Sequence, residues 1–312
     1  MPISDKLRLF TDYVVNFDTS HRNPKWVIEH VNKKSLAGDG TRKNSEFFED
    51  DGIEPRFRSK LTDYRGSGFD RGHMAPASNH KASQQAMDET FCLSNMSPQV
   101  GKGMNRDYWA RFERFAQLLT NTCDDVWIVT GPLYLPRPSP DGWRMDYRLL
   151  GAPPQLMSVP THYFKVVLGE VKPQFGGAAK TAVGAFVMPN APIDPDMPLL
   201  AYTVPLSALE EVAGLRFFPA YISDDRRLAL DEASLAWQRV GQAEARRLKP
   251  GSYLPPLLPG EVAAAAAAAL VPKQPAGPPM VLTGAGGRGA VHVCEHTECR
   301  LPKEDWYKAN GK

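Results

Sequence analysis

The spacing of apolar and polar residues along the chain predicts a mixture of strands and helices. Short runs rich in β-branched and aromatic residues, typical of strands, occupy residues 10–17, 26–31, 126–130, 163–168 and 183–188. Because turn residues at 22–24 separate the first two runs, we expect these two strands to form an antiparallel pair. Gly131 and Pro132 follow the third run directly, which predicts that this strand ends at Thr130.

The clearest helix begins at Asn105. Its apolar residues recur at helical spacing and form one face: Tyr108, Trp109, Phe112, Phe115, Ala116 and Leu119. Residues 207–210 (SALE) have the sequence of a capping box, and Gly214 is placed to end the short helix that this box would start. A last helix is expected over residues 225–248.

Polar and low-complexity segments set the expected domain limits. Residues 33–57 predict a surface excursion, and residues 63–69, with two glycines, predict a loop. Proline, alanine and glycine dominate residues 249–288, which is typical of a linker. We therefore expect three parts: a main domain over 1–258 with its candidate catalytic core at about 56–120, a low-complexity insertion or linker over 259–289, and a tail over 290–312 that packs back on the main domain.

Length and charge narrow the class of protein. A chain of 312 residues can bury a core without metals or disulfides. The formal net charge of +2 argues against a basic coat over the whole surface, so a nucleic-acid partner would have to be met by a local patch. Basic residues outnumber the acidic Asp63 and Asp70 between positions 56 and 81: Arg56, Arg58, Lys60, Arg65, Arg71 and Lys81. No run approaches the roughly 20 apolar residues of a membrane helix, so no span is expected.

The cysteines are too few and too scattered for a disulfide scaffold, and we expect them to be mostly small buried residues: Cys92, Cys123, Cys294 and Cys299. In the tail, the alternation of His292, Cys294 and His296 would suit a strand with three candidate zinc ligands on one face, and Cys299 would be the fourth. Four ligands as close together in the sequence as these rarely complete a tetrahedral zinc site. We therefore favour a terminal strand with free or paired cysteines.

The chemistry concentrates at residues 70–77 (DRGHMAPA) and in the helix that follows. His73 can be neutral near pH 7 and act as a base, and Arg71 can pair two phosphate oxygens. Asn105 offers an amide oxygen of the kind that magnesium prefers, although asparagine is also a good helix cap. Glu113 lies about 12 Å along an ideal helix and about 80° around it, so we assign it to the metal's waters rather than to direct coordination. A solvated surface glutamate is the alternative.

The ordered series of motifs resembles the non-specific DNA/RNA endonucleases, specifically the endonuclease G branch. The site motifs that carry this resemblance are residues 70–77, Leu93-Ser94-Asn95 with Pro98-Gln99, and Asn105 through Trp109 to Glu113. Further matching segments are residues 22–27, 63–69, 130–133, 159–165 and 209–218. The resemblance covers most of the chain and thins beyond about residue 248.

The resemblance implies a fold, an activity and a setting. The fold would be α+β, the ββα-metal nuclease fold, with a central mostly antiparallel sheet flanked by helices. The activity would be Mg²⁺-dependent hydrolysis of DNA and RNA to 5′-phosphate ends, with Mn²⁺ as a substitute, by a mitochondrial homodimer. Residues 1–6 lack the features of a secretory signal or transit peptide, so we expect either a truncated mature form or a chain that stays where it is made.

The resemblance also suggests individual roles. His73 would be the general base, and Arg58 occupies the upstream arginine position, where Arg56 could serve instead. Asn95 would orient the metal shell or the base, and Asp70 would brace the loop or the outer metal shell. Nucleic-acid binding is assigned to four basic residues: Arg56, Arg58, Arg71 and Lys81. Relative to animal members, residues 100–104 before Asn105 contain one extra residue, which their glycines make easy to absorb.

Two other classes of protein compete with a magnesium nuclease. The first is a non-catalytic nucleic-acid-binding protein on the same fold, which would be favoured if His73 or Asn105 were missing; both are present. The second is a zinc-stabilised interaction module at residues 290–312, which metal analysis of the purified protein would detect.

Overall fold

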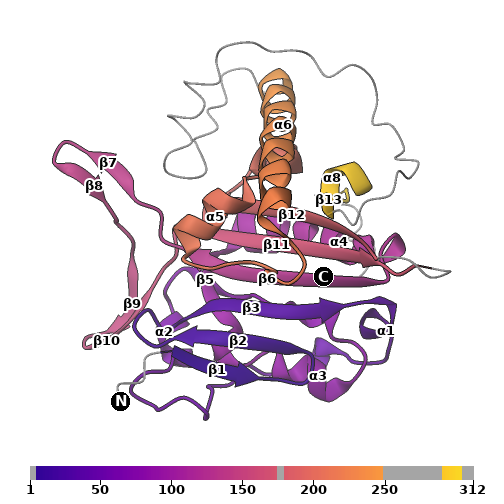
Figure 1. The fold of residues 1–312 in the computed structure, drawn as a ribbon. Helices are drawn as coiled ribbons and strands as arrows, with labels where there is room; N and C mark the ends of the chain where they lie inside the picture. The colour runs from indigo at the N-terminus through magenta and orange to yellow at the C-terminus, as the bar shows by residue number, and fades with distance from the viewer. Residues whose placement is uncertain (1–4, 174–178, 249–289, 304–312) are drawn as a thin grey trace.

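A seven-stranded sheet forms the centre of the protein in the computed structural model, which describes residues 5–173, 179–248 and 290–303 (Figure 1). In spatial order the strands are β1 (Asp5–Leu9), β2 (Tyr13–Asp18), β3 (Asn23–Val31), β6 (Asp125–Leu133), β11 (His162–Val171), β12 (Lys180–Pro189) and β13 (Ala290–His292). Neighbouring strands are antiparallel except β13, which pairs with β12 in parallel. The expected antiparallel pairing of the first two predicted strands is confirmed as β2 with β3.

The predicted strand limits near the N-terminus need correction. Residues 10–12 are not strand but the turn into β2, closed by a hydrogen bond from Phe10 N to Tyr13 O (3.0 Å). β1 was not predicted from the sequence. It is an edge strand, and its apolar residues Leu7 and Leu9 are exposed rather than part of a buried face. The turn before β3 ends at Arg22, whose φ of 53° is left-handed, so residues 23 and 24 belong to the strand rather than to the turn.

The strand predicted to end at Thr130 continues through Gly131 and Pro132 as part of β6. Gly131 makes room for the ring of Phe164, which a Cβ would approach to 2.6 Å. The pairing of β3 with β6 stops at Thr130, so Pro132 lies where β6 has a partner on one side only, and a missing N–H is tolerated there.

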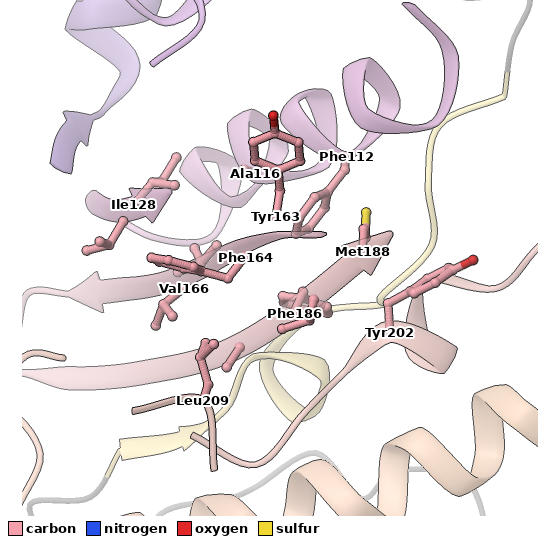
Figure 2. Close-up of a cluster of buried hydrophobic side chains, with 14 of the residues drawn as sticks. Phe112, Ala116, Ile128, Tyr163, Phe164, Val166, Phe186, Met188, Tyr202 and Leu209 are labelled. Carbon is pink, nitrogen blue, oxygen red and sulfur yellow. The ribbon is translucent and has the colours of Figure 1, made fainter. Parts of the chain in front are cut away.

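The predicted helix after residue 105 is confirmed and packs on the sheet. It runs through η4 (Gly101–Trp109), α4 (Ala110–Leu118) and a short turn, η5 (Leu119–Asn121). Lys102 and Gly103 interrupt it with non-helical angles, and Gly103 has a φ of 81°. Figure 2 shows Phe112 and Ala116 on one side of β11 and β12, with Leu209 on the other. The central strands are therefore buried on both faces.

Two helices pack on the second face of the sheet, α5 (Leu206–Ala213) and α6 (Asp224–Leu248). The predicted α6 is confirmed to within one residue. Gly214 ends α5 with a φ of 63°, as expected, but the predicted capping box is wrong. The N-cap is Pro205, two residues before the predicted Ser207. The Glu210 carboxylate accepts hydrogen bonds from Phe217 N (2.7 Å) and from Arg227 instead of from the helix start.

Short elements complete the described chain. The hairpins are β4 (Phe69–His73) with β5 (Met96–Val100), β7 (Arg137–Ser139) with β8 (Gly142–Arg144), and β9 (Leu149–Ala152) with β10 (Gln155–Ser158). The short helices are α1 (Lys33–Leu36), η1 (Arg42–Asn44), α2 (Leu61–Tyr64), η2 (Ala77–Asn79), α3 (Gln84–Glu89), η3 (Leu93–Asn95) and η6 (Leu199–Tyr202). The loop predicted over residues 63–69 is thus partly α2 and partly β4.

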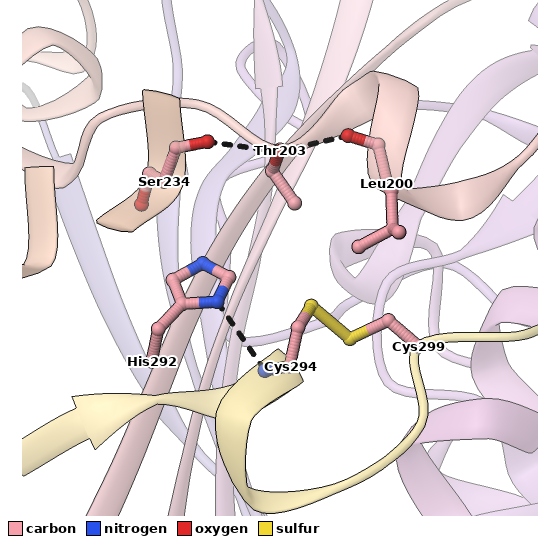
Figure 3. The surroundings of a disulfide bond; sticks show 6 residues. All are labelled: Leu200, Thr203, Ser234, His292, Cys294 and Cys299. Carbon is pink, nitrogen blue, oxygen red and sulfur yellow. Dashed lines mark hydrogen bonds between the residues drawn. A yellow bond between two sulfur atoms is a disulfide. The ribbon is translucent and has the colours of Figure 1, made fainter. Parts of the chain in front are cut away.

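The tail differs from the predicted strand. After β13 the chain turns into α8 (Val293–His296), so residues 294 and 296 are helical and the alternating zinc-ligand face is wrong. Cys294 and Cys299 form a disulfide with an S–S distance of 2.08 Å (Figure 3). Cys92 and Cys123 are free and buried. The predicted linker lies outside the described residues. Among the helices that are described, none is long and apolar enough to span a membrane.

Candidate active site

The hairpin of β4 and β5 carries His73. Antiparallel pairing sets Asp70 opposite Gln99 and His73 opposite Met96. His73 is therefore the last residue of a strand. Gly72 is required at its position because the buried Gln99 side chain lies over it, and a Cβ on residue 72 would come within 1.9 Å of Gln99 Oε1.

Neighbouring rings and one buried amide fix the position of His73. The imidazole meets the Phe91 ring edge-on at a centroid distance of 4.9 Å and the Phe47 ring at 5.8 Å. Asn95, which is fully buried, accepts from Ala75 N (2.9 Å) and donates to the carbonyl oxygens of Ala75 (2.9 Å) and Thr90 (2.8 Å). Asn95 thus holds the backbone that follows His73.

Asn105 is oriented by a carboxylate from β4. Its Nδ2 donates to Asp70 Oδ2 (3.0 Å), and Arg106 donates from Nε to the same oxygen (2.7 Å) and from Nη2 to Oδ1. Burial would raise the pKa of Asp70, but the hydrogen bonds from Arg106 and Asn105 outweigh it and hold that pKa below its ordinary value. Asp70 therefore stays ionised, and it fixes which end of the Asn105 amide is turned away from it.

These residues share one cleft of about 1280 Å³. The predicted site residues that line it are Asp70, Arg71, His73, Asn105 and Glu113. The Arg71 guanidinium lies 4.1 Å from the centre of the Phe47 ring, an arrangement that holds a cation at the cleft wall. Glu113 is largely buried, so the alternative of a solvated surface glutamate is wrong.

The cleft is not lined by four predicted residues: Arg56, Arg58, Lys81 and Asn95. Arg58 pairs with Glu49 (3.0 Å) and Asp51 (2.6 Å), and Arg56 pairs with Glu54 (2.6 Å). The predicted basic stretch was counted from residue 56 and therefore excluded Glu49, Asp51 and Glu54. These acids neutralise Arg56 and Arg58. The structure therefore does not bring Arg56 or Arg58 to the cleft.

Three lining arginines were missed by sequence reasoning: Arg42, Arg106 and Arg111. Arg106 is adjacent to Asn105 on the predicted helix and could have been found from that position. Arg111 lies two residues before Glu113, but only the packed structure shows that it faces the cleft. Arg42 lies in the polar excursion, where no pattern marks it.

The residues of the cleft fit a hard divalent cation. Asn105 offers an amide oxygen, and the carboxylates of Glu113 and Asp70 line the same cleft, Asp70 with its oxygens engaged by Asn105 and Arg106. Gly101 admits the Asp70 carboxylate, because a Cβ at that position would lie 2.9 Å from Asp70 Oδ2. In the described ranges, no cluster of three or more histidine, cysteine or acidic side chains could form a metal cage. The residues therefore fit an ion that keeps most of its waters.

Comparison with known proteins identifies the family. Residues 1–222 match the DNA/RNA non-specific endonuclease family. The chain is 42% identical over 260 residues to the mitochondrial nuclease of Saccharomyces cerevisiae, covering 82% of this chain and 78% of that protein. It is 41% identical over 220 residues to human mitochondrial endonuclease G, covering 70% and 71%. A crystal structure of an EndoG/EndoGI complex aligns with a TM-score of 0.66 and 42% identity over 73% of this chain and 91% of that chain.

The chain therefore belongs to the DNA/RNA non-specific endonuclease family. It is a hydrolase that acts on the phosphodiester bonds of DNA and RNA, and the family implies dependence on a divalent metal. The predicted fold class is confirmed as well: a central mostly antiparallel sheet flanked by helices, in the arrangement of endonuclease G.

Proposed function

We propose that the protein is a Mg²⁺-dependent, sugar-non-specific endonuclease that leaves 5′-phosphate ends, with His73 as general base and Asn105 as the protein ligand of a single metal ion. The observation that carries the proposal is that His73, Asn105 and Arg71 line the same cleft although they come from β4 and from the long helix. Mn²⁺ would substitute for Mg²⁺, because both prefer oxygen ligands.

His73 would take a proton from the attacking water. A neutral imidazole near pH 7 suits this role, and proton transfer by a positioned base contributes about 10²–10⁴-fold to a rate. Support comes from the contacts with Phe47 and Phe91, which hold the ring, and from the amide of Asn95, which holds the backbone after it. In this account Asn95 positions the base and does not touch the substrate.

Asn105 would hold the metal through the oxygen that faces away from Asp70, and Glu113 would bind the metal's waters. Bound Mg²⁺ supplies a Lewis acid at the phosphate and at the departing oxygen. Asp70 would act from behind Asn105, since its carboxylate is already engaged by Asn105 and Arg106. This arrangement leaves the ion mostly hydrated, as magnesium sites on proteins usually are.

Arg71 would pair with oxygens of the scissile phosphate and offset charge that develops there. Several arginines along the cleft can contact the sugar–phosphate backbone: Arg42, Arg65, Arg71, Arg106 and Arg111. Backbone contacts carry little sequence information, which supports cleavage of DNA and RNA without marked preference. Arg56, Arg58 and Lys81 would then contribute at most long-range charge.

The experiment that tests this proposal uses circular single-stranded DNA, plasmid and RNA, each with and without Mg²⁺, followed by end-group analysis of the products. Cleavage of all three substrates only with the metal, with 5′-phosphate ends, is expected. Binding without cleavage would instead favour a non-catalytic nucleic-acid-binding protein. Products with 3′-phosphate ends would contradict the proposed hydrolysis to 5′-phosphate ends.

We also propose that the protein forms a homodimer and acts in mitochondria. The mitochondrial setting is supported by the names of the yeast and human relatives. The dimer rests on the resemblance to the endonuclease G branch alone. Light scattering on the purified protein tests the dimer, and fractionation of cells that express the full gene product tests the compartment.

A further inference from the structure

We propose that Arg111 binds a phosphate of the substrate two or three nucleotides from the scissile bond, and that the disulfide-closed tail holds Arg111 in place for this contact. The inference rests on the location of the scissile phosphate near His73 and Asn105 proposed above. It adds a substrate contact on the side of α4 that leads away from the metal ligand.

The position of Arg111 extends the cleft along the helix. Asp107, Ala110 and Arg111 line its wall at helical spacing, beyond Asn105. Arg111 lies six positions after Asn105, which corresponds to about 9 Å of helix rise. Successive nucleotides of one strand rise by about 3.4 Å, so this distance spans between two and three nucleotides.

Arg111 is a buried cation held by backbone carbonyl groups. Its Nε donates to Pro302 O (2.7 Å), its Nη1 donates to Pro195 O (2.7 Å), and the residue is 9% exposed. Within residues 5–173, 179–248 and 290–303 it forms no ion pair with a carboxylate, whereas Arg58 and Arg106 each do. A buried charge without a counter-ion is unfavourable. A phosphate in the cleft would supply the missing negative charge.

The guanidinium keeps donors available for that phosphate. An arginine carries five N–H donors in a planar fork. In the described ranges Nη2 makes no hydrogen bond, because the contacts with Pro302 and Pro195 use only Nε and Nη1. Two carbonyl groups therefore fix the plane of the fork while one end of it stays free to bind an anion.

The tail reaches Arg111 from the edge of the sheet that β13 forms. β13 pairs with β12, and Val293 fills the space over Gly184, where a Cβ would lie 2.3 Å from its side chain. His292 Nδ1 accepts from Cys294 N (3.3 Å) and caps α8, and the disulfide joins Cys294 to Cys299 (Figure 3). Figure 2 shows the yellow C-terminal segment running from there past the strands toward α4. The disulfide thus anchors the chain just before Pro302.

Reduction of this disulfide is expected to release Arg111. A dithiol reductant such as dithiothreitol supplies two electrons and two protons, so that the S–S bond becomes two thiols and the reductant becomes a cyclic disulfide. The segment after Cys299 then loses its anchor, and Pro302 O no longer has a fixed position. The rings of Phe47 and Phe91 hold His73, and Asp70 orients Asn105, so the chemical step should be preserved.

The experiment compares a dinucleotide with a 20-nucleotide single strand at several salt concentrations. Arg111→Ala should raise KM for the long substrate about tenfold, with kcat and dinucleotide cleavage changed less than twofold. The slope of log KM against log salt should fall by about 0.7, the value for one lost phosphate contact on a single strand. Arg111→Lys keeps the charge, so its KM for the long substrate should lie between those of wild type and Arg111→Ala. Arg114→Ala, a cation on the same helix that does not line the cleft, is the matched control.

The tail is tested with Cys294→Ser/Cys299→Ser and with wild-type protein reduced after folding. Both should raise KM for the 20-nucleotide strand in the same direction as Arg111→Ala, and the reductant should not change the serine variant further. An equal rise for both substrates, or an unchanged salt slope, would overturn the phosphate contact. Wild-type KM in the reduced protein would overturn the role of the tail. Failure of wild-type protein to cleave either substrate with Mg²⁺ would instead refute the proposed function.

Discussion

Asp70 shows how single residues set up the site without touching the substrate. One carboxylate accepts from Asn105 and from Arg106, and it fits against the bare backbone of Gly101. The sequence suggests a bracing role for Asp70, because it begins the DRGH motif, but it cannot show that the partner is the candidate metal ligand. That contact depends on β4 and the long helix packing together.

Asp70→Asn is expected to weaken metal use while keeping the fold. The amide has nearly the same shape but loses the ion pair with Arg106 and one acceptor for Asn105, so Asn105 should no longer be held in one orientation. Loss of such a supporting contact typically costs about 10–100-fold in metal affinity or activity. A Mg²⁺ titration of the cleavage rate measures this. Asp146→Asn, which breaks an exposed pair with Arg137, is the control, and equal Mg²⁺ requirements in both variants would contradict the argument.

Gly72→Ala should destabilise the protein through one close contact. The new Cβ would lie 1.9 Å from Oε1 of the buried Gln99, so the side chain or the hairpin must shift. Overpacking of this kind costs typically about 1–3 kcal/mol. Urea denaturation measures the loss, and adding Gln99→Ala should restore part of it by removing the clashing group. No restoration in the double variant would show that the loss has another cause.

At the scale of elements, local pattern predicted the helices and central strands but not their limits. The helix after Asn105 and the strands β11 and β12 have long, regular apolar patterns. β1 was missed because its leucines are exposed at the sheet edge. The predicted tail strand is confirmed only over β13, because the His292 cap and the disulfide favour α8 after it. Pairing partners and covalent cross-links decide these cases, and neither is visible in hydrophobic periodicity.

His292 makes the tail sensitive to acid. Burial lowers its pKa to about 4, against an ordinary value near 6.5 in the unfolded chain. The unfolded state therefore binds a proton first, and stability that is complete above pH 6.5 is lost as the pH falls toward 4. The loss from this one group amounts to at most about 3–4 kcal/mol.

The free energy of unfolding, measured at pH 7.5 and at pH 5.0, tests this effect. His292→Asn keeps a residue that can cap α8 but removes the titrating group, so its stability should change less between the two pH values. His162, whose pKa burial also lowers to about 4, remains in both proteins and sets the residual change. An identical pH dependence in wild type and variant would contradict the assignment.

At the scale of the whole molecule, the family and the principal site could be predicted because the motifs occur in a fixed order along the chain. The set of residues that line the cleft could not be predicted from the sequence. Arg42 comes from a segment with no mark of function, and only the packed structure shows that Arg111, two residues before Glu113, faces the cleft. The acids at residues 49–54 that neutralise Arg56 and Arg58 matter only once the chain is folded. Charge counted along the sequence therefore misplaced the basic patch.

The segment of residues 259–287 is expected to be dispensable, on composition alone. Proline, alanine and glycine offer little apolar surface for a packed core, and the cleft-lining residues in the described part of the chain lie at or before Glu113. Joining Leu258 to Arg288 should leave a folded, active nuclease, since closure entropy changes by only about 0.6 kcal/mol per doubling of loop length. Melting temperature and plasmid cleavage check this, and a large fall in either would show that the segment belongs to the fold.

The central claim is that His73 is the base of a metal-dependent phosphodiesterase site. The most direct measurement is the single-turnover rate of plasmid cleavage by His73→Ala at pH 7 and saturating Mg²⁺, with DNA affinity and melting temperature measured on the same preparation. The account predicts a rate at least about 10²–10⁴-fold below wild type, with DNA affinity nearly unchanged. A folded His73→Ala variant that cleaves plasmid at the wild-type rate would contradict it.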